Sequence, residues 1–374
     1  MKFTIMAGEL ADTVGWAAHA LPKKTYAPVL NGLLIEADNG EIILSAFDYD
    51  TSRQASIDVD AAVTPGRILV PGRLLADVVK ALPKGEIVDF SADDQEATIR
   101  CGRSEYVIPL MPVDDYPSLP KPPAPIGAVE PKLFAAAVAQ TAVAAGNDPV
   151  VPMLNGVFLE VGDGLMHLAA TDRYRITWRK FGWTPALDAA EVKALIPAKV
   201  LGDVVRGLPD EAVHICVGDG LAAFIAGSRT TTVRLIDEEF ITIPSKFEAV
   251  EKNTPVTVTF DAGELAKVVK RVALMTSRSS SVRLSFTQDG VLVEAGDRSL
   301  AGLASEQADC LLDGDDIQVA FTVGYLLDML GAFGGSVQMR APKLQPFEAK
   351  AVVFRRGQDD DDYRHMLMPV RIAP

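Results

Sequence analysis

Long apolar runs are missing from this chain of 374 residues, and so is any excess of basic charge. No run of about 18 apolar residues occurs, which argues against a membrane-spanning helix. The segment Met1–Ile5 passes directly into a strand-like pattern, so we expect no secretory signal peptide. The net charge is −14, which taken alone disfavours nucleic acid as a partner, because DNA-binding domains usually carry a basic patch. Total charge, however, does not say where the basic residues lie.

Cysteine and histidine are also scarce. The three cysteines, Cys101, Cys216 and Cys310, are odd in number and far apart, so we expect free, buried thiols in a reducing compartment. The four histidines are scattered, and none has a partner at metal-ligand spacing. We therefore expect neither a metal site nor a cofactor.

One sequence segment occurs in three similar copies, which begin at Val70, Ile196 and Phe321. Its apolar residues recur at positions i, i+1, i+4, i+5 and i+8, which form one face of an α-helix. Arg73, Lys199 and Gly324 are equivalent, so the period is about 125 residues. That period is too long for a solenoid repeat and suits three copies of one domain.

Each third of the chain predicts the same series of elements. A strand and a helix come first, and the helices are expected at Glu9–Leu21, Lys132–Ala145 and Glu264–Leu274, the last with Asp261 as N-cap. A hairpin follows, with tight turns at Asn39-Gly40, Asp163-Gly164 and Asp289-Gly290. The repeated helix and further strands complete the unit.

This order predicts an α+β fold of three repeated domains, each with two helices packed on antiparallel sheets. We place the domains at residues 1–122, 123–252 and 253–374. The proline-rich segment Met111–Gly127 predicts a stiff, extended connector between the first two, and a polar junction at Asp237–Pro255 separates the last two.

No catalytic motif accompanies this repeat. The chain has no G-x-S-x-G elbow, no G-x-x-x-x-G-K-[ST] loop and no H-E-x-x-H sequence. Asp48 and Asp172 occupy matching positions, but the third copy has Arg298 there. We therefore expect a protein that is not an enzyme.

Several short motifs occur together in an order that is similar to a known family. They are Met1–Thr4, the pair Leu30–Gly32 and Leu154–Gly156, the element Ala170–Asp172, and the end Met368–Ile372. Over the whole chain the sequence resembles the bacterial DNA polymerase III β subunit, the replicative sliding clamp. The resemblance implies a head-to-tail homodimer that forms a ring around duplex DNA, with helices lining the hole and sheets outside. It also implies a cytoplasmic protein associated with the nucleoid, which tethers the replicative polymerase for processivity.

In such a ring, basic residues of the lining helices would attract phosphates without reading sequence. A solvated helix face is the alternative explanation for each of them. The candidates for DNA binding are Lys23, Lys24, Arg73, Lys80, Lys199, Arg206, Lys267, Lys270 and Arg271.

The family also implies an apolar pocket that binds short peptides of the replicative polymerase, the clamp loader and other partners. Ordinary strand packing is the alternative for its methionines. The matching positions are Leu154, Thr171, Arg173, Tyr174, Arg175, Ile176, Tyr325, Met366, Met368, Pro369, Val370 and Arg371. Arg173 and Tyr174 replace the family's usual glycine and histidine, and Ile241 replaces a proline. These departures leave the role of 241–247 open.

The resemblance places the contact between the two copies of the ring at apolar positions of the first and third domains. The matching residues are Tyr106, Ile108, Leu274 and Met275. The usual charge pairing around them is altered, and we hypothesise an ion pair between Glu105 of one copy and Arg298 of the other.

Two other functions stay open at this point. The departures fit a specialised second clamp with an altered pocket for partners or inhibitors. A repeat scaffold that does not encircle DNA would lack basic residues on the lining faces of its helices.

Overall fold

The computed structural model describes residues 1–24, 27–59, 63–186, 191–252, 254–297, 302–343, 349–357 and 362–371. The chain forms two compact units. The N-terminal unit comprises Met1–Pro131, Thr184–Ala189 and Asp203–Leu235, and the C-terminal unit comprises Lys132–Trp183, Ala190–Gly202 and Ile236–Pro374. The central third of the sequence therefore contributes to both units.

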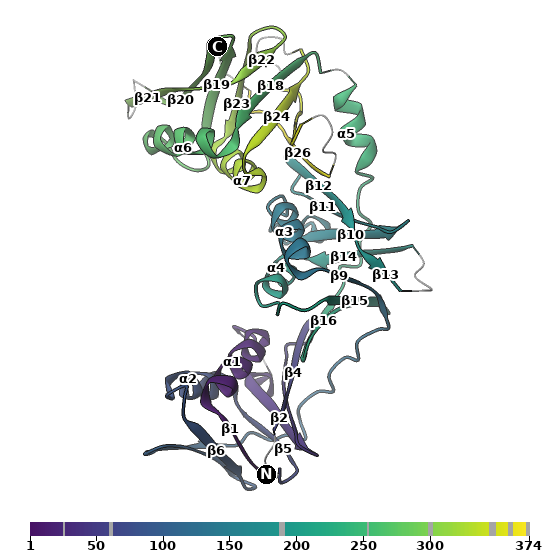
Figure 1. Cartoon of the computed structure of the whole chain (residues 1–374), viewed down its shortest axis with the longest axis vertical. Coiled ribbons are helices and arrows are strands. Elements are labelled where there is room, and N and C mark those ends of the chain that lie inside the picture. The colour runs from purple at the N-terminus through teal and green to yellow at the C-terminus, as the bar shows by residue number, and fades with distance from the viewer. Residues whose placement is uncertain are drawn as a thin grey trace. The chain divides into compact units, whose positions relative to one another are not determined.

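The N-terminal unit contains two antiparallel sheets with helices packed against them (Figure 1). Its sheets have the orders β1-β6-β7-β8 and β13-β9-β15-β16-β17-β4-β3-β2-β5. Its helices are α1 (Ala7–Ala17) and α2 (Gly72–Ala81). Its strands are β1 (Lys2–Met6), β2 (Gly32–Asp38), β3 (Glu41–Phe47), β4 (Thr51–Asp58), β5 (Gly66–Pro71), β6 (Ile87–Ala92), β7 (Glu96–Cys101), β8 (Ser104–Pro109), β9 (Pro125–Val129), β13 (Thr184–Pro185), β15 (Val213–Gly218), β16 (Leu221–Ala226) and β17 (Arg229–Arg234).

The C-terminal unit repeats this plan with sheets of order β14-β10-β11-β12-β26-β25-β24-β18-β22 and β21-β20-β19-β23. Its helices are α3 (Pro131–Ala142), α5 (Pro244–Glu251), α6 (Ala262–Val272) and α7 (Val323–Phe333), and α4 (Ala198–Arg206) has residues in both units. Its strands are β10 (Gly156–Gly162), β11 (Leu165–Thr171), β12 (Arg175–Gly182), β14 (Val192–Pro197), β18 (Val256–Asp261), β19 (Ser281–Thr287), β20 (Gly290–Asp297), β21 (Gly302–Ala308), β22 (Leu311–Asp313), β23 (Ile317–Thr322), β24 (Ser336–Ala341), β25 (Val352–Arg355) and β26 (Tyr363–Leu367).

The expected hairpins and helices are present. The turns at Asn39 and Asp163 have φ values of 46° and 50°, as an Asn-Gly or Asp-Gly hairpin turn requires. The Asp261 carboxylate accepts a hydrogen bond from the backbone N–H of Glu264, 2.9 Å away, so Asp261 is an N-cap as predicted. The first helix ends at Ala17 and continues as a 3₁₀ turn over Ala18–Ala20.

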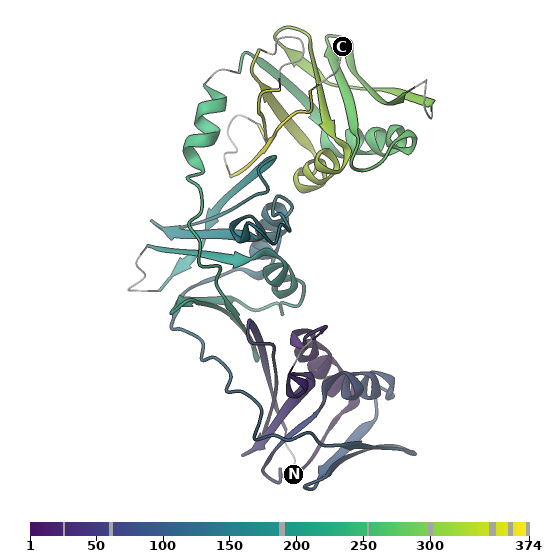
Figure 2. The same cartoon turned by 180° about the vertical axis from the view of Figure 1, so that it is seen from behind.

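Two parts of the connectors differ from the expectation. The proline-rich connector becomes strand β9 at Pro125, and Tyr116 anchors it to the sheet by packing in a cluster with Leu34, Phe47 and Leu69. The second junction contains a helix, α5, that the sequence analysis did not predict. Figures 1 and 2 both show α5 on the side of the sheet opposite α6 and α7.

Each nine-stranded sheet joins two sequence repeats through one antiparallel pair of strands. In the N-terminal unit, β17 pairs with β4 from Arg229 opposite Ala55 to Val233 opposite Thr51. In the C-terminal unit, β12 pairs with β26 from Arg175 opposite Leu367 to Arg179 opposite Tyr363. Continuous hydrogen-bonded ladders therefore connect neighbouring repeats.

A second contact stabilises the first of these junctions. The centre of the Trp16 indole ring is 5.1 Å from the guanidinium group of Arg53 and 5.3 Å from that of Arg229. Arg53 also donates a hydrogen bond to the backbone carbonyl of Trp16. Gly207 lies so close that an added Cβ would be 3.1 Å from the indole nitrogen.

The two thiols Cys101 and Cys216 are buried and free, as expected, while Cys310 is half-buried. Burial raises the pKa of Cys216 to about 11, so this thiol is inert near neutral pH. Among the helices that the structure describes, none is long and apolar enough to span a membrane.

Candidate functional site

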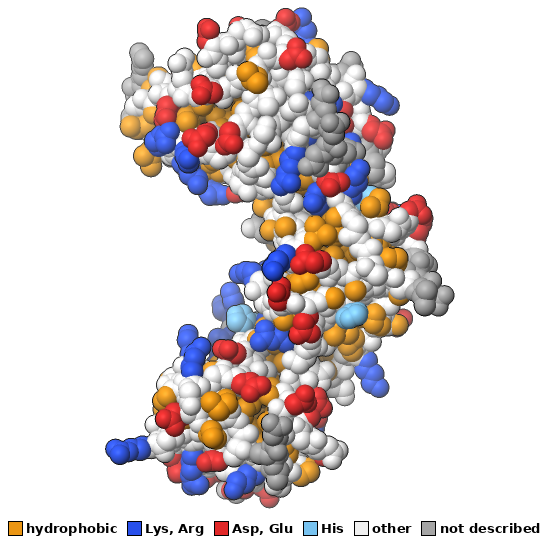
Figure 3. All heavy atoms as spheres, in the orientation of Figure 1, with side chains coloured by type: hydrophobic (Ala, Val, Ile, Leu, Met, Phe, Trp, Pro, Cys, Tyr) orange, Lys and Arg blue, Asp and Glu red, His pale blue; other side chains and the backbone are white. Residues whose placement is uncertain are grey.

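The first copy of the repeated helix, α2, carries two of the predicted basic residues on its exposed face. Leu75 and Val79 of α2 are buried, while Arg73 and Lys80 on the other side are exposed. Leu74 is 46% exposed, so it is not part of the core as its apolar spacing suggested. Acidic and basic side chains are interspersed on the face shown in Figure 3.

Contacts within the chain divide the nine DNA-binding candidates into two groups. Arg206 pairs with Asp203, Lys267 with Glu264 and Arg271 with Glu306, and Arg73 donates to the carbonyl of Pro22 over 2.7 Å. The other five are exposed and form no ion pair within the part of the chain that the structure describes. They are Lys23, Lys24, Lys80, Lys199 and Lys270.

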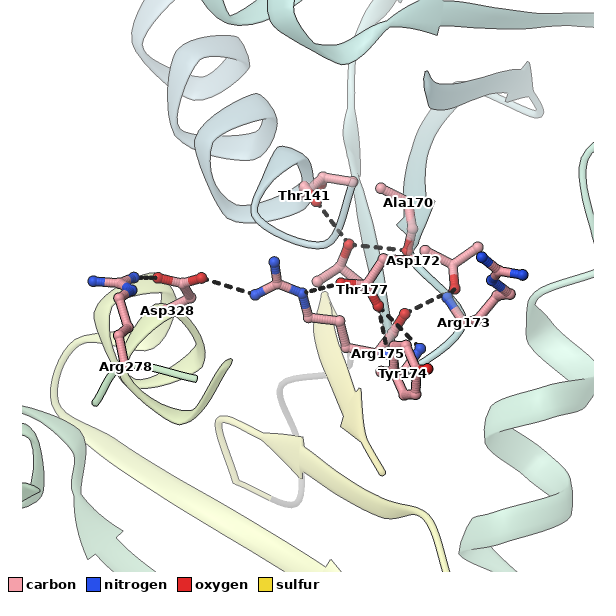
Figure 4. A network of polar contacts seen from close by, with 10 residues as sticks. Thr141, Ala170, Asp172, Arg173, Tyr174, Arg175, Thr177, Arg278 and Asp328 are labelled. Atoms are coloured by element: carbon pink, nitrogen blue, oxygen red, sulfur yellow. Dashed lines mark hydrogen bonds and ion pairs between the residues drawn. The ribbon is translucent and has the colours of Figure 1, made fainter. Parts of the chain in front are cut away.

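Among the pocket candidates, Arg175 is the centre of a polar network (Figure 4). Its side chain is 9% exposed and bonds the carboxylates of Asp172 and Asp328, each at 2.9 Å. Its guanidinium also lies 4.4 Å from the centre of the Tyr325 ring. Asp328 in turn binds Arg278, so the network ties β12 to α7 and to the segment before β19.

The turn before β12 positions Tyr174. One carboxylate oxygen of Asp172 accepts hydrogen bonds from the backbone N–H groups of Tyr174 and Arg175, both at 3.0 Å. Arg173 therefore takes a φ of 80°, in the left-handed region. Tyr49 has a φ of 75° at the matching turn of the first repeat, so this conformation belongs to the repeated fold.

An exposed apolar group surrounds this turn. Tyr174 is 59% exposed, Met368 39% and Val370 39%. The rings of Tyr174 and Tyr325 are 6.3 Å apart, and the carbonyl of Tyr174 accepts a hydrogen bond from the backbone N–H of Met368. Burial raises the pKa of Tyr325, with a smaller contribution from the Asp172 carboxylate, so this phenol stays neutral at physiological pH.

The remaining pocket candidates lie elsewhere. Leu154 and Thr171 are buried, and the Thr171 hydroxyl donates to the carbonyl of Arg175. Arg173 is bound to Asp148 at 3.0 Å. Ile176 and Met366 are paired across β12 and β26, on the face of the sheet opposite Arg175. Pro369 is buried and Arg371 is exposed in the last described segment.

Sequence reasoning missed the role of Asp328, although a signal existed. The repeated helix has aspartate at the same position in all three copies, at Asp77, Asp203 and Asp328. Asp203 and Asp328 both bind an arginine in the structure. No comparable sequence pattern pointed to Arg278, which binds Asp328, or to Asp148, which binds Arg173.

The predicted ring-contact residues differ in how exposed they are. Ile108 is 2% exposed and belongs to the core of its own unit, and Tyr106 packs against the same core. The outward side chains of β8 are Glu105 and Val107, because neighbours in a strand face opposite sides. Glu105 already binds Arg100 at 2.6 Å, and Arg298 lies outside the described residues.

Leu274 and Met275 are exposed to 82% and 45% in the C-terminal unit. Strands β8 and β21 each form the free edge of a four-stranded sheet, whereas Met111 and Ile236 hydrogen-bond to the edge strands β5 and β14. A free edge with exposed apolar neighbours suits pairing with another chain.

Comparisons with known proteins agree with this arrangement. Three family models match in order: the DNA polymerase III beta subunit N-terminal domain over residues 1–120, its central domain over 128–241 and its C-terminal domain over 248–371. The beta sliding clamp of Streptomyces coelicolor is 37% identical over 100% of both chains. The beta sliding clamp homolog GriR of Streptomyces muensis is 32% identical over 99% of both.

The fold has solved counterparts as well. A sliding clamp from Pseudomonas aeruginosa bound to griselimycin superposes with a TM-score of 0.90 at 24% identity, over 100% of both chains. One from Bacillus subtilis gives 0.90 at 23% identity, also over 100% of both. The family consists of non-enzymatic clamps that close as dimeric rings around DNA and bind the polymerase and other proteins. With its three repeats matched in order from end to end, the chain belongs to the DNA polymerase III β subunit family of sliding clamps.

Proposed function

We propose that this clamp slides on DNA mainly through its five exposed lysines without ion pairs. The observation that supports this assignment is the division of the nine basic candidates by their contacts within the chain. A cation already bound to a carboxylate or a backbone carbonyl of the same chain must break that bond before it can neutralise a phosphate. Lys23, Lys24, Lys80, Lys199 and Lys270 have no such competitor among the described residues. Their long, flexible side chains suit contacts that shift from one phosphate to the next.

The salt dependence of duplex binding tests this assignment. Each phosphate contact contributes about 0.9 to the slope of log affinity against log salt. Replacing the five lysines by alanine should reduce that slope by up to about 4.5 for each copy of the chain in the ring. The matched control, K267A with R206A, removes two cations that are ion-paired and should change it by less than about 1. Equal effects per residue in both sets would contradict the assignment.

Retention on circular and on linear DNA tests the clamp function itself. The protein is loaded onto nicked circular plasmid by a clamp loader and passed through a sizing column, and the plasmid is then linearised. Retention on circles that disappears on linear DNA is the expected result, because enclosure holds the ring rather than affinity. Equal retention on both forms would mean ordinary binding.

For partner peptides, we infer a site around Tyr174, Tyr325 and Met368, continuing toward Ile176 and Met366. The exposed apolar side chains would bury bulky side chains of a peptide, and methionine adapts readily to different partners. The arginine network would keep Tyr325 and the turn in position. We expect M368A to weaken peptide binding measured by fluorescence anisotropy, while the dimeric mass stays unchanged.

Ring closure is proposed to join the β8 edge of one copy to the β21 edge of the other, with Val107 and Leu274 among the buried side chains. The substitution L274E should shift the protein from dimer to monomer in analytical ultracentrifugation. L311E is the matched control, since Leu311 is 76% exposed on β22 at a different sheet edge. The Glu105–Arg298 pair stays a prediction for a double charge swap.

Three further assignments complete the proposal. The domain boundaries are placed at 122/123 and 252/253. The protein is inferred to act in the cytoplasm on nucleoid DNA. The main replicative role is favoured over that of a specialised second clamp, because the chain is 37% identical to a relative named beta sliding clamp and 32% identical to one named beta sliding clamp homolog.

A further inference from the structure

Helix α5 covers a defined row of side chains on the nine-stranded sheet of the C-terminal unit. Residues that face each other across an antiparallel pair point to the same side of the sheet. Ile176 lies opposite Met366, which also lies opposite Val353, and the next such pair is Trp178 with Arg364. This side is the outer face, away from α6 and α7 (Figure 2).

Two apolar side chains from the α5 segment are buried in this row. Phe247 is 0% exposed and Ile243 is 3% exposed, and both belong to one cluster with Met366 and Val353. Ile176 and Trp178 pack against the same cluster. Phe247 therefore occupies the apolar surface that Ile176 and Met366 would otherwise offer to a ligand.

Charged groups hold the helix in this place. The Glu251 carboxylate at the end of α5 lies 3.3 Å from Arg364 and 3.8 Å from Arg355, and all three side chains are at most 15% exposed. The Arg364 guanidinium also lies 5.9 Å from the centre of the Phe247 ring. By contrast, Ser245, Lys246 and Glu248 face solvent.

The helix has little stability of its own. It spans eight residues and has no side-chain N-cap hydrogen bond, and isolated helices of this length are marginal in water. Its attachment therefore depends on the buried Phe247 and Ile243 and on Glu251, with the partly buried Phe240, Ile241 and Val250 packed against the same cluster. A segment held by few contacts can leave the sheet without unfolding the unit below it.

We propose that Phe247 is an intramolecular plug of the peptide site. A partner peptide gains the surface between Ile176 and Met366 only when α5 moves away, so α5 competes with the peptide. The plug makes the clamp selective for peptides that also bind the exposed surface of Tyr174 and Met368. This proposal rests on the peptide site inferred above.

Apparent affinity falls in proportion to the fraction of molecules in the open state. If α5 is closed in nine molecules of ten or more, removing the plug tightens binding by about tenfold or more. The probe is a fluorescein-labelled peptide, Gly-Ser-Leu-Ser-Leu-Phe, whose last two residues supply bulky apolar side chains. Binding to the full-length dimer is measured by fluorescence anisotropy.

Two variants open the site by different routes. F247A removes the plug itself, and E251Q weakens the ion pairs that hold α5 while leaving every apolar side chain in place. Both should bind the probe about tenfold or more tightly than wild type. K246A is the matched control on the exposed side of the same helix and should leave the affinity unchanged. Circular dichroism and dimeric mass confirm that each variant is folded.

Hydrogen exchange gives a readout that simple packing would not produce. Saturating peptide should accelerate exchange of the backbone amides of residues 245–251 in wild type, because the displaced helix loses its hydrogen bonds. A peptide that binds wild type, F247A and E251Q equally, with unchanged exchange, would overturn the plug and leave the peptide site intact. Absence of binding to any variant, or binding unaffected by M368A, would overturn both the plug and the site.

Discussion

Acid should destabilise the C-terminal unit through one buried histidine, His365. Its side chain is 0% exposed, and its Nδ1 lies 3.1 Å from the hydroxyl of Tyr363. That hydroxyl donates to the carbonyl of Gln140 over 2.9 Å, so its oxygen accepts the proton carried by Nδ1. Nε2 is buried and has no hydrogen-bond partner among the described residues.

Burial, with a smaller effect of the nearby Arg175, lowers the pKa of His365 to about 3. An unfolded chain titrates histidine near 6.5. Below pH 6.5 the unfolded state takes up a proton that the native state refuses, so stability falls as the pH falls toward 3. The loss is about 1.4 kcal/mol per pH unit, or about 2 kcal/mol at pH 5, and no such loss occurs above pH 6.5.

The assay is urea unfolding between pH 7.5 and pH 5, followed by tryptophan fluorescence in a W16F background. Trp178 and Trp183 then report on the C-terminal unit alone. H365N keeps a hydrogen-bond donor near the Nδ1 position and cannot be protonated. Its free energy of unfolding should start lower than that of wild type but fall by about 2 kcal/mol less on going to pH 5.

Carboxylates also titrate between pH 7.5 and pH 5, so the test is the difference between wild type and H365N in the pH dependence of the free energy of unfolding. Parallel pH curves for wild type and H365N would refute the reasoning. They would mean that protonated His365 finds a partner in the native state.

Three further substitutions test other contacts by urea unfolding. D261A removes the N-cap of α6 and should cost about 1 kcal/mol, and D261N should restore most of it. G207A forces a methyl group against Trp16, which two arginines hold in place, and should cost about 1–3 kcal/mol; an unchanged midpoint would show that the indole can shift. D328N removes one of two carboxylates from the buried Arg175 and should cost about 1–3 kcal/mol, while D77N, at the matching position of α2, is expected to change stability by less than about 0.5 kcal/mol.

The repeats, hairpins and repeated helices could be predicted from the sequence because local patterns determine them. A helical face needs only apolar spacing, and a tight turn needs only residues that tolerate positive φ, such as Asn39 and Asp163. The exposure of Lys80 and Lys199 followed from the same spacing, since the side of a helix opposite the core must face solvent. No tertiary information was required for either.

The surroundings of the proposed peptide site were harder to predict from the sequence. The sequence analysis interpreted the segment Asp237–Pro255 as a polar junction, whereas burial of Phe247 depends on a sheet built from β12 and β26, which are far apart in the chain. The orientation of Ile108 depends on strand register, because a shift of one residue exchanges the two faces. The ion pairs of Asp328 required the packing of α7 against β12, which the repeated aspartate alone does not specify.

The ladders between β17 and β4 and between β12 and β26 also bear on the mechanics of the ring. A pulled antiparallel ladder resists separation through many backbone hydrogen bonds that share the load. The two junctions within each chain are ladders of that kind, whereas in the ring closure proposed above the edges of β8 and β21 would meet only between copies. Force applied to a ring closed in this way would therefore concentrate at the joint between copies rather than at the ladders within each chain.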